Sequence, residues 1–197
     1  MVNRRRGRRD TNEDTVVVYR KGRTIYFFDE VDDESVCEAI KFIDEIEEES
    51  TKKDITIKIN SGGGGCYDGL ALYDRIRQSP CNIIMIGSGL IGSMGLIIFL
   101  AGDERMISEN ARLLNHQVSI EEFSGRNIDF KLEQKELDTL NSINAEIISE
   151  RTGQSIKKLN NETLPGDKFM GAQFAVENGY ADEIIKNTRT YRRKKNR

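Results

Sequence analysis

Several residue types are scarce in this 197-residue chain, and each scarcity excludes a class of protein. The sequence holds no tryptophan, two prolines, three cysteines and one histidine. No apolar run approaches the roughly 18 residues that a membrane-spanning helix needs, and the charged N-terminus lacks the apolar core of a secretory signal. Cys37, Cys66 and Cys81 are odd in number and lack metal-type spacing, which indicates reduced thiols. We therefore expect a cytoplasmic protein with no membrane span and no metal.

The net charge of −3 conceals an acidic body between two basic ends. Arginines crowd residues 4–9, and arginines and lysines crowd residues 189–197. We predict a disordered basic tail over 1–15, one folded domain over 16–187 and a second basic tail over 188–197. Basic tails bind nucleic acid in some proteins, but no aromatic side chain is interleaved among the N-terminal arginines. Solubilising ends are the favoured interpretation, and nucleic acid is not an expected partner.

Strand-like and helix-like patterns alternate along the chain. Runs of β-branched and aromatic residues or period-two alternation indicate strands, and apolar residues at helical spacing indicate helices. The expected strands are 16–19, 24–28, 54–59, 82–86, 104–107, 111–114, an exposed segment over 119–125, and 181–185. The expected helices are 33–49, 67–76, 96–101, 127–151, 154–161 and 170–178. This order predicts an α/β fold with a largely parallel sheet and right-handed crossovers.

The stretch from Gly87 to Leu100 is the feature around which the chain is organised. It follows an apolar strand, gathers small residues in a turn and continues into a helix that is apolar on all sides. Ser93 lies in the first turn of that helix. The free N–H groups and positive dipole end of a helix N-terminus suit a developing oxyanion. A tight turn packed for shape alone is the alternative interpretation.

Four consecutive glycines, Gly62–Gly65, follow a strand that ends near Asn60. Their freedom to take positive φ lets the backbone approach another chain closely. No Gly-Lys-Ser/Thr follows, so the loop is not a nucleotide P-loop, and it lacks the acidic residue of a dinucleotide fingerprint. We therefore expect no cofactor. A flexible linker is disfavoured because a buried strand ends here and an amphipathic helix begins just after.

His116 is the one imidazole available to activate a serine. A serine hydroxyl is a weak nucleophile until a proton acceptor is within hydrogen-bond reach, so a serine–histidine enzyme must use this residue. A lysine dyad and a purely structural histidine are the alternatives. The imidazole also needs a group on its other nitrogen to fix its tautomer. Asp167, in a turn beside Gly166, is a candidate for that group.

Five separated motifs stand in register along most of the chain. They are Ile59–Gly64, Gly92–Gly95, His116–Gln117, Arg151–Gln154 and Asp167–Phe169. In order and approximate spacing they resemble the Clp protease proteolytic subunit family of caseinolytic serine peptidases, over about residues 24–185. The resemblance implies a Clp/crotonase-like fold of stacked ββα units, with the long helix near 127–151 as a protruding handle. It also implies Ser93 as nucleophile, His116 as general base and then acid, and Asp167 as the group that orients His116.

The same resemblance implies a peptide-binding site within a ring. The backbone N–H groups of Gly63 and Met94 would form the oxyanion hole, and the glycine loop and segment 119–125 would pair with the main chain of an extended peptide. The substrate-binding residues so implied are Gly62, Gly64, Gly65, Gln117, Ser119, Phe123 and Gly125. The expected substrates are peptides or unfolded proteins, and the expected assembly is a homo-oligomer with heptameric rings.

Four departures from the family pattern leave the assembly open. Gly62 and Val118 stand where family members carry proline, and Pro165 and Gly166 stand where an acidic–basic pair links two rings. The segment before Thr24 is short and arginine-rich, unlike the family's axial loops that meet an unfoldase. Ring–ring stacking and docking to a AAA+ unfoldase therefore stay open. Such divergence would suit a phage or otherwise specialised relative, including a capsid-maturation protease.

Two other functions fit parts of the pattern. A crotonase-type acyl-CoA enzyme would use the same fold and an oxyanion hole that grips a thioester, but it needs no serine–histidine–aspartate set. A catalytically silent assembly subunit would keep the fold without the activity. Retention of Ser93, His116 and Asp167 argues against both. The sequence therefore predicts a serine endopeptidase.

Overall fold

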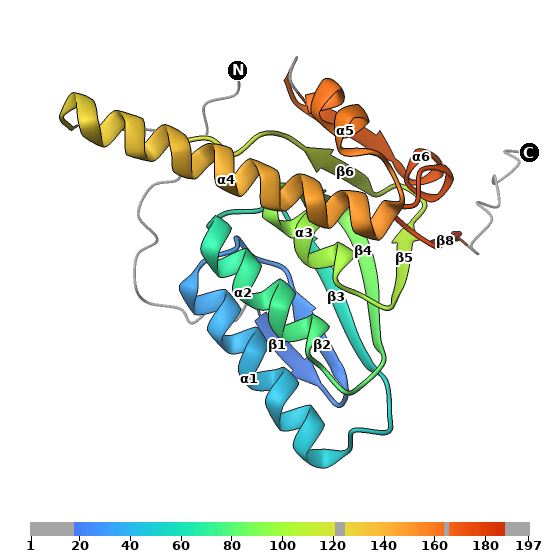
Figure 1. Ribbon diagram of the computed structural model, residues 1–197. Coiled ribbons are helices and arrows are strands. Elements are labelled where there is room, and N and C mark those ends of the chain that lie inside the picture. Colours follow the sequence, from blue (N-terminus) through green and yellow to red (C-terminus); the bar gives the residue numbers. More distant parts are fainter. Residues whose placement is uncertain (1–17, 121–124, 164–165, 188–197) are drawn as a thin grey trace, which may run out of the picture.

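The computed structural model describes residues 18–120, 125–163 and 166–187, so both predicted tails lie outside the described residues. One sheet runs through the described part in the order β1-β2-β3-β4-β5-β8, with β6 against β4 and β7 against β6 (Figure 1). Its strands are β1 (Val18–Lys21), β2 (Thr24–Phe27), β3 (Ile55–Ser61), β4 (Ile83–Gly92), β5 (Glu104–Ser108), β6 (Arg112–Asn115), β7 (Lys168–Gly171) and β8 (Glu183–Ile185). The helices are α1 (Asp33–Glu49), α2 (Cys66–Arg77), α3 (Met94–Leu100), α4 (Asn127–Thr152), α5 (Ile156–Thr163) and α6 (Ala172–Glu177).

The expectation of a largely parallel sheet is confirmed. Only β1–β2 and β6–β7 are antiparallel among the strand pairs of the described residues. The long strand β4 serves two neighbours on one side. Its first half pairs with β5, up to Gly87 opposite Ile107, and its last three residues pair with β6, ending at Gly92 opposite Leu114. The second sheet segment, β6 and β7, therefore starts from the end of β4.

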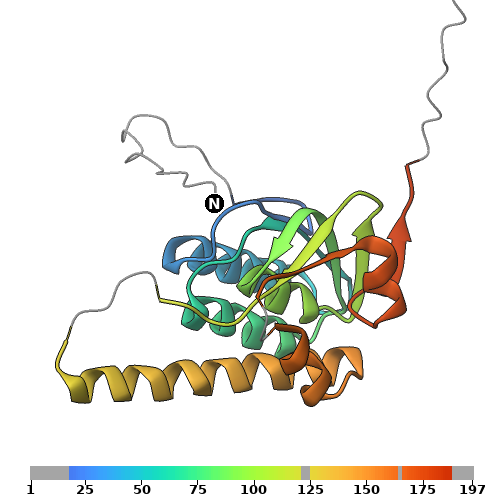
Figure 2. The ribbon, with the colours of Figure 1, turned by 90° about the horizontal axis from the view of Figure 1, so that it is seen from above.

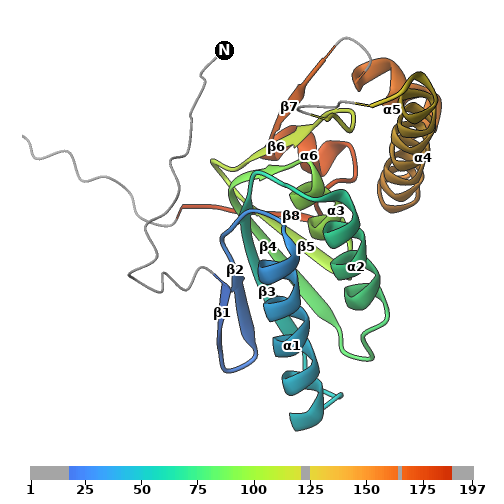
Figure 3. The same ribbon diagram turned by 90° about the vertical axis from the view of Figure 1, so that its left-hand side faces the viewer.

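Three helices, α1, α2 and α3, cover one face of the central strands (Figure 3). Helix α1 starts at a capping box: Ser35 N–H donates to Asp32 Oδ1 at 2.8 Å, and Asp32 N–H donates to Ser35 Oγ at 3.1 Å. All residues of α3 are buried, as its uniformly apolar sequence predicts. This buried helix fixes the segment that begins at Ser93.

Helix α4 projects beyond the body of the molecule (Figures 1 and 2). It spans 26 residues and ends where Gly153 takes a left-handed conformation, with φ of 73°. Its buried residues, which begin at Leu140, lie in its second half. Near its start, the side chains of Ile128 and Leu132 are more than half exposed. The predicted handle helix is therefore present, with apolar side chains at its free end.

Three expectations about local structure need correction. The small-residue segment from Gly87 to Gly92 is strand and not turn: Gly89, with φ of 62°, passes close to the Asn60 side chain, and Ile91 pairs again with Ser61 of β3 beyond a shift in register. The segment expected to start a helix at Met170 is instead strand β7, because it pairs with β6. Ser119 and Ile120 belong to no described strand, and residues 121–124 lie outside the described residues.

No helix in the described ranges is long and apolar enough to cross a membrane.

Candidate active site

Ser93 stands at the junction of β4 and α3 in a backbone conformation that side chains rarely adopt. Its φ is 51° and its ψ is −125°, and it is the only non-glycine residue with positive φ among those described. Its N–H donates to Leu114 O at 2.9 Å, which fastens it to β6. The hydroxyl occupies the N-cap position of α3 without capping the helix, so it is left to face the adjacent cleft. Backbone strain of this kind gathers at functional sites.

The glycine loop is held against Ser93 from two sides. Gly63 has φ of 101°, and a Cβ added there would lie 2.5 Å from Ser93 Cβ. On the other side, Val31 N–H donates to Gly63 O at 2.9 Å and Gly65 N–H donates to Val31 O at 2.7 Å. The loop is therefore fixed in place, which rules out the flexible-linker interpretation.

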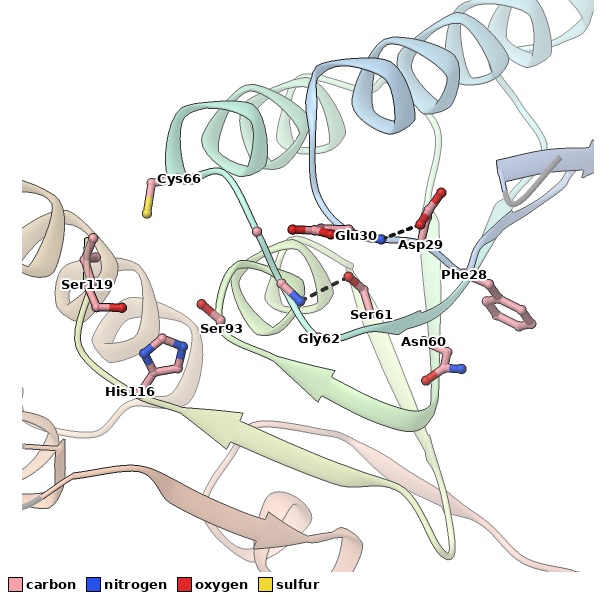
Figure 4. A pocket seen from close by; sticks show the side chains of 13 residues that line it. Phe28, Asp29, Glu30, Asn60, Ser61, Gly62, Cys66, Ser93, His116 and Ser119 are labelled. Carbon is pink, nitrogen blue, oxygen red and sulfur yellow. Dashed lines mark hydrogen bonds between the residues drawn. The ribbon is translucent and has the colours of Figure 1, made fainter. Parts of the chain in front are cut away.

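The two N–H groups expected in the oxyanion hole are in different states. Gly63 N–H donates to Ser61 Oγ at 3.2 Å, and Ser61 is only 3% exposed (Figure 4). Met94 is buried, and its N–H is at the first position of α3. A first-position N–H has no acceptor within its own helix. One of the two donors is thus engaged by an internal hydroxyl.

Two strand ladders bring His116 and Asp167 toward Ser93. Strand β6 lies between β4 and β7: Gly92 is opposite Leu114 in one ladder, and Asn115 is opposite Lys168 in the other. The ladder ends at this pair, so His116 directly follows the last paired residue of β6 and Asp167 directly precedes the first paired residue of β7. Three residues far apart in sequence therefore flank strand ends that lie at one end of the sheet.

In the part of the chain that the structure describes, no hydrogen bond connects the side chains of these three residues, which all adjoin the same end of the sheet. His116 Nδ1 lies 2.6 Å from Gln117 O. Because a carbonyl oxygen only accepts, Nδ1 carries the proton and Nε2 is left as the proton acceptor. Within the described ranges no hydrogen bond links His116 to Ser93 or to Asp167, and Asp167 is exposed. The carbonyl of Gln117 thus holds the imidazole in the tautomer that a general base requires.

Ser93 and His116 open into a cleft of about 740 Å³ (Figure 4). Its lining residues are Phe28, Asp29, Glu30, Asn60, Ser61, Gly62, Gly63, Gly64, Cys66, Ser93, His116, Val118 and Ser119. Burial raises the pKa of the Cys66 thiol, which keeps it protonated near neutral pH and leaves Ser93 as the stronger candidate nucleophile. No group of three His, Cys, Asp or Glu side chains in the described part could hold a metal ion.

The comparisons with known proteins agree on one family. The family model described as Clp protease matches residues 7–188. The ATP-dependent Clp protease proteolytic subunit 1 of Corynebacterium jeikeium is 33% identical over 165 residues, 83% of this chain and 87% of that protein. The subunit of the same name from Leifsonia xyli is 34% identical over 83% of each chain. Among solved structures, a ClpP1 point mutant from Listeria monocytogenes has a TM-score of 0.77 and 28% identity, over 85% of this chain and 93% of that one.

The chain belongs to the Clp protease family. Membership confirms both the resemblance and the fold expected from the five motifs, and it makes this Clp protease family member a serine peptidase. It also favours the peptidase interpretation over the acyl-CoA enzyme that would share the fold.

Only some of the residues expected to bind substrate line the cleft of this Clp protease family member. Gly62, Gly64 and Ser119 line it. Gly65 caps α2, and Gln117 faces a smaller cavity of about 30 Å³ behind His116. Gly125 is exposed before α4, and Phe123 lies outside the described residues.

Sequence reasoning missed the far wall of the cleft, formed by Phe28, Asp29 and Glu30. The available signal was the pair of carboxylates directly after an apolar strand, at the carboxyl end where parallel strands present functional side chains.

Replacement of Gly63 by alanine tests the contact between the loop and Ser93. The added methyl group overlaps Ser93 Cβ, so we expect labelling of Ser93 by a fluorophosphonate probe to slow by about 100-fold. Gly22→Ala is the matched control, since Gly22 also has positive φ, 58°, but its added Cβ meets nothing within 4 Å. Equal labelling rates in the two variants, measured by intact-protein mass spectrometry, would refute the close approach.

Proposed function

We propose that this chain is a serine endopeptidase in which Ser93 is the nucleophile, His116 the general base and Asp167 the carboxylate that orients the imidazole. The proposal rests on one observation above all: a strained serine opens into a cleft beside the chain's only histidine. Membership in the Clp protease family supplies the reaction class. Asp167 is proposed as the third member because it directly precedes Lys168, which pairs with Asn115, the residue before His116.

In the proposed reaction Ser93 Oγ attacks the scissile carbonyl carbon while its proton passes to His116 Nε2. The carbonyl oxygen becomes an oxyanion, which accepts hydrogen bonds from the N–H groups of Gly63 and Met94. Collapse of this intermediate breaks the C–N bond, and the imidazolium gives its proton to the leaving amine. Water then attacks the acyl-enzyme with His116 again as base, which releases the acid and restores Ser93.

Two hydrogen bonds must be exchanged before this reaction proceeds. Gly63 N–H must leave Ser61 Oγ to meet the oxyanion, and His116 Nδ1–H must pass from Gln117 O to the Asp167 carboxylate. The second exchange matters because a carboxylate stabilises the imidazolium formed during attack more strongly than a carbonyl does. In both exchanges the N–H donor keeps an acceptor, while Ser61 Oγ, which is buried, gives up the donor that it has in the free protein.

We propose that the substrate is an extended segment of peptide or unfolded protein lying along the glycine loop. Gly62, Gly64 and Gly65 would offer main-chain groups on one side, with Gln117 and segment 119–125, including Ser119, Phe123 and Gly125, on the other. Recognition through the peptide backbone is tolerant of side-chain sequence. Selectivity would then come from access to the site.

Access would be controlled by assembly into a homo-oligomer of heptameric rings in the cytoplasm. The name of the C. jeikeium relative calls it a subunit of an ATP-dependent protease, which supports a AAA+ unfoldase as partner here. The exposed Ile128 and Leu132 on the projecting half of α4 suit burial against another subunit.

Covalent labelling tests the proposed nucleophile. A fluorophosphonate should add to one residue per wild-type chain, peptide mapping should find the adduct on Ser93, and Ser93→Ala should neither label nor cleave a fluorogenic peptide. Ser88→Ala, the same substitution four residues before the end of β4 and outside the cleft lining, should behave as wild type. Peptide cleavage by a folded Ser93→Ala protein would overturn the assignment.

Native mass spectrometry tests the proposed ring. We expect assemblies with a mass of seven chains of 22.4 kDa, or a multiple of seven. A protein that remains monomeric or dimeric at micromolar concentration while cleaving peptide would contradict the chambered assembly and leave the catalytic assignment standing.

A further inference from the structure

The residue before Asp167 and the residue after it differ in how firmly the structure fixes them. Before it, Gly166 has φ of 137° and open space around the position of a Cβ, with a 3.2 Å hydrogen bond from its N–H to Thr163 O closing the turn. After it, Lys168 opens β7 and pairs with Asn115 in the ladder to β6. A glycine at positive φ allows many conformations. The position of Asp167 therefore depends chiefly on what fixes Lys168.

Lys168 is fixed by two contacts from two helices. Its Nζ forms an ion pair with Glu162 of α5, and it lies 4.7 Å from the centre of the Phe174 ring of α6. The side chains of Lys168 and Glu162 are only 17% and 25% exposed. Partial withdrawal from water reduces screening of the charges, so this pair holds its geometry better than a surface salt bridge does.

The ion pair spans the turn that carries Asp167. Glu162 lies five residues before Asp167 and Lys168 one residue after it, so their contact links the end of α5 to the start of β7. Successive side chains of an extended segment point to opposite faces. Because Lys168 is anchored toward α5 and α6, an extended backbone at this point would turn the Asp167 side chain to the opposite face, beside the end of β6 that His116 follows.

We propose that the Glu162–Lys168 ion pair is a positioning clamp for Asp167, set within a single chain. Neither residue touches the substrate: the pair sets the register and facing of β7 so that the Asp167 carboxylate meets His116 when the imidazole leaves Gln117 O. This inference rests on the proposed function of Asp167.

The Glu162–Lys168 ion pair is separate from the charged groups that face His116. The cleft side of the imidazole carries the carboxylates of Asp29 and Glu30. The small cavity behind it is lined by uncharged residues from β6, α4 and α5. Within the described residues, the cation nearest to Asp167 along the chain is thus Lys168, which is already paired with Glu162.

Two single substitutions and one charge swap test the clamp. Lys168→Met keeps the aliphatic stem over Phe174 without the charge, and Glu162→Gln keeps the shape of the partner. Each should lower kcat for a fluorogenic peptide about tenfold and leave KM within about twofold, because a misplaced catalytic group costs rate and not binding. The swapped pair, Glu162→Lys with Lys168→Glu, should recover kcat to within about threefold of wild type. Lys157→Met, at an exposed lysine of α5, is the matched control and should match wild type.

A double-mutant cycle separates positioning from general stabilisation. If the clamp acts through Asp167, Lys168→Met should slow Ser93 labelling in the wild-type background but cause no further loss in an Asp167→Asn background. Equal losses in both backgrounds, or full kcat in both single variants, would overturn the clamp. Native mass spectrometry and thermal melting identify any variant that fails to fold. If Lys168→Met fails to fold, the kcat of Glu162→Gln tests the clamp. A wild-type protein that does not label at Ser93 would instead refute the proposed function.

Discussion

The arrangement of the site depends on one strand, β4, which pairs with two different strands, β5 and β6, along one of its edges. The first half of β4 is paired to β5, and its last residues turn to β6, which in turn pairs with β7. Because Ser93 follows β4, His116 follows β6 and Asp167 precedes β7, these ladders bring all three residues to one end of the sheet. Gly89 has φ of 62° and passes close to the Asn60 side chain, and a Cβ added there would lie 2.5 Å from Asn60 Oδ1. A larger residue at Gly89 would therefore clash with β3 just before β4 reaches β6.

Two of the candidate catalytic groups, Gly63 N–H and the His116 imidazole, form hydrogen bonds within the protein itself. Backbone strain at Ser93 costs on the order of 1–3 kcal/mol, and the fully buried helix α3 offsets it. A buried N–H without an acceptor would add a further penalty, which Ser61 Oγ removes by accepting from Gly63. The Gln117 carbonyl is the acceptor for His116 Nδ1, at a site that is open to water. Substrate therefore replaces existing hydrogen bonds and does not create the site from unpaired groups.

The sequence predicted the α/β class, the handle helix and the three candidate catalytic residues, because each leaves a local signal. Ser93 follows small residues before an apolar helix, His116 is the only imidazole, and Asp167 sits beside a glycine. The strand at Lys168–Gly171 was missed because four residues carry little periodicity and its pairing with β6 is set by tertiary contacts. The segment Gly87–Gly92 reads locally as a turn, and only its neighbours make it a strand. The engagement of Gly63 N–H by Ser61 leaves no trace in sequence.

The proposed reaction requires that Gly63 N–H and His116 Nδ1 each exchange one hydrogen-bond acceptor for another. The most direct measurement is a structure of the protein with a peptide boronate bonded to Ser93 Oγ, since a tetrahedral boronate imitates the oxyanion. The account predicts Gly63 N–H within about 3.2 Å of a boronate oxygen and His116 Nδ1 hydrogen-bonded to Asp167. A boronate complex in which Gly63 N–H still donates to Ser61 Oγ and His116 still pairs with Gln117 O would contradict it.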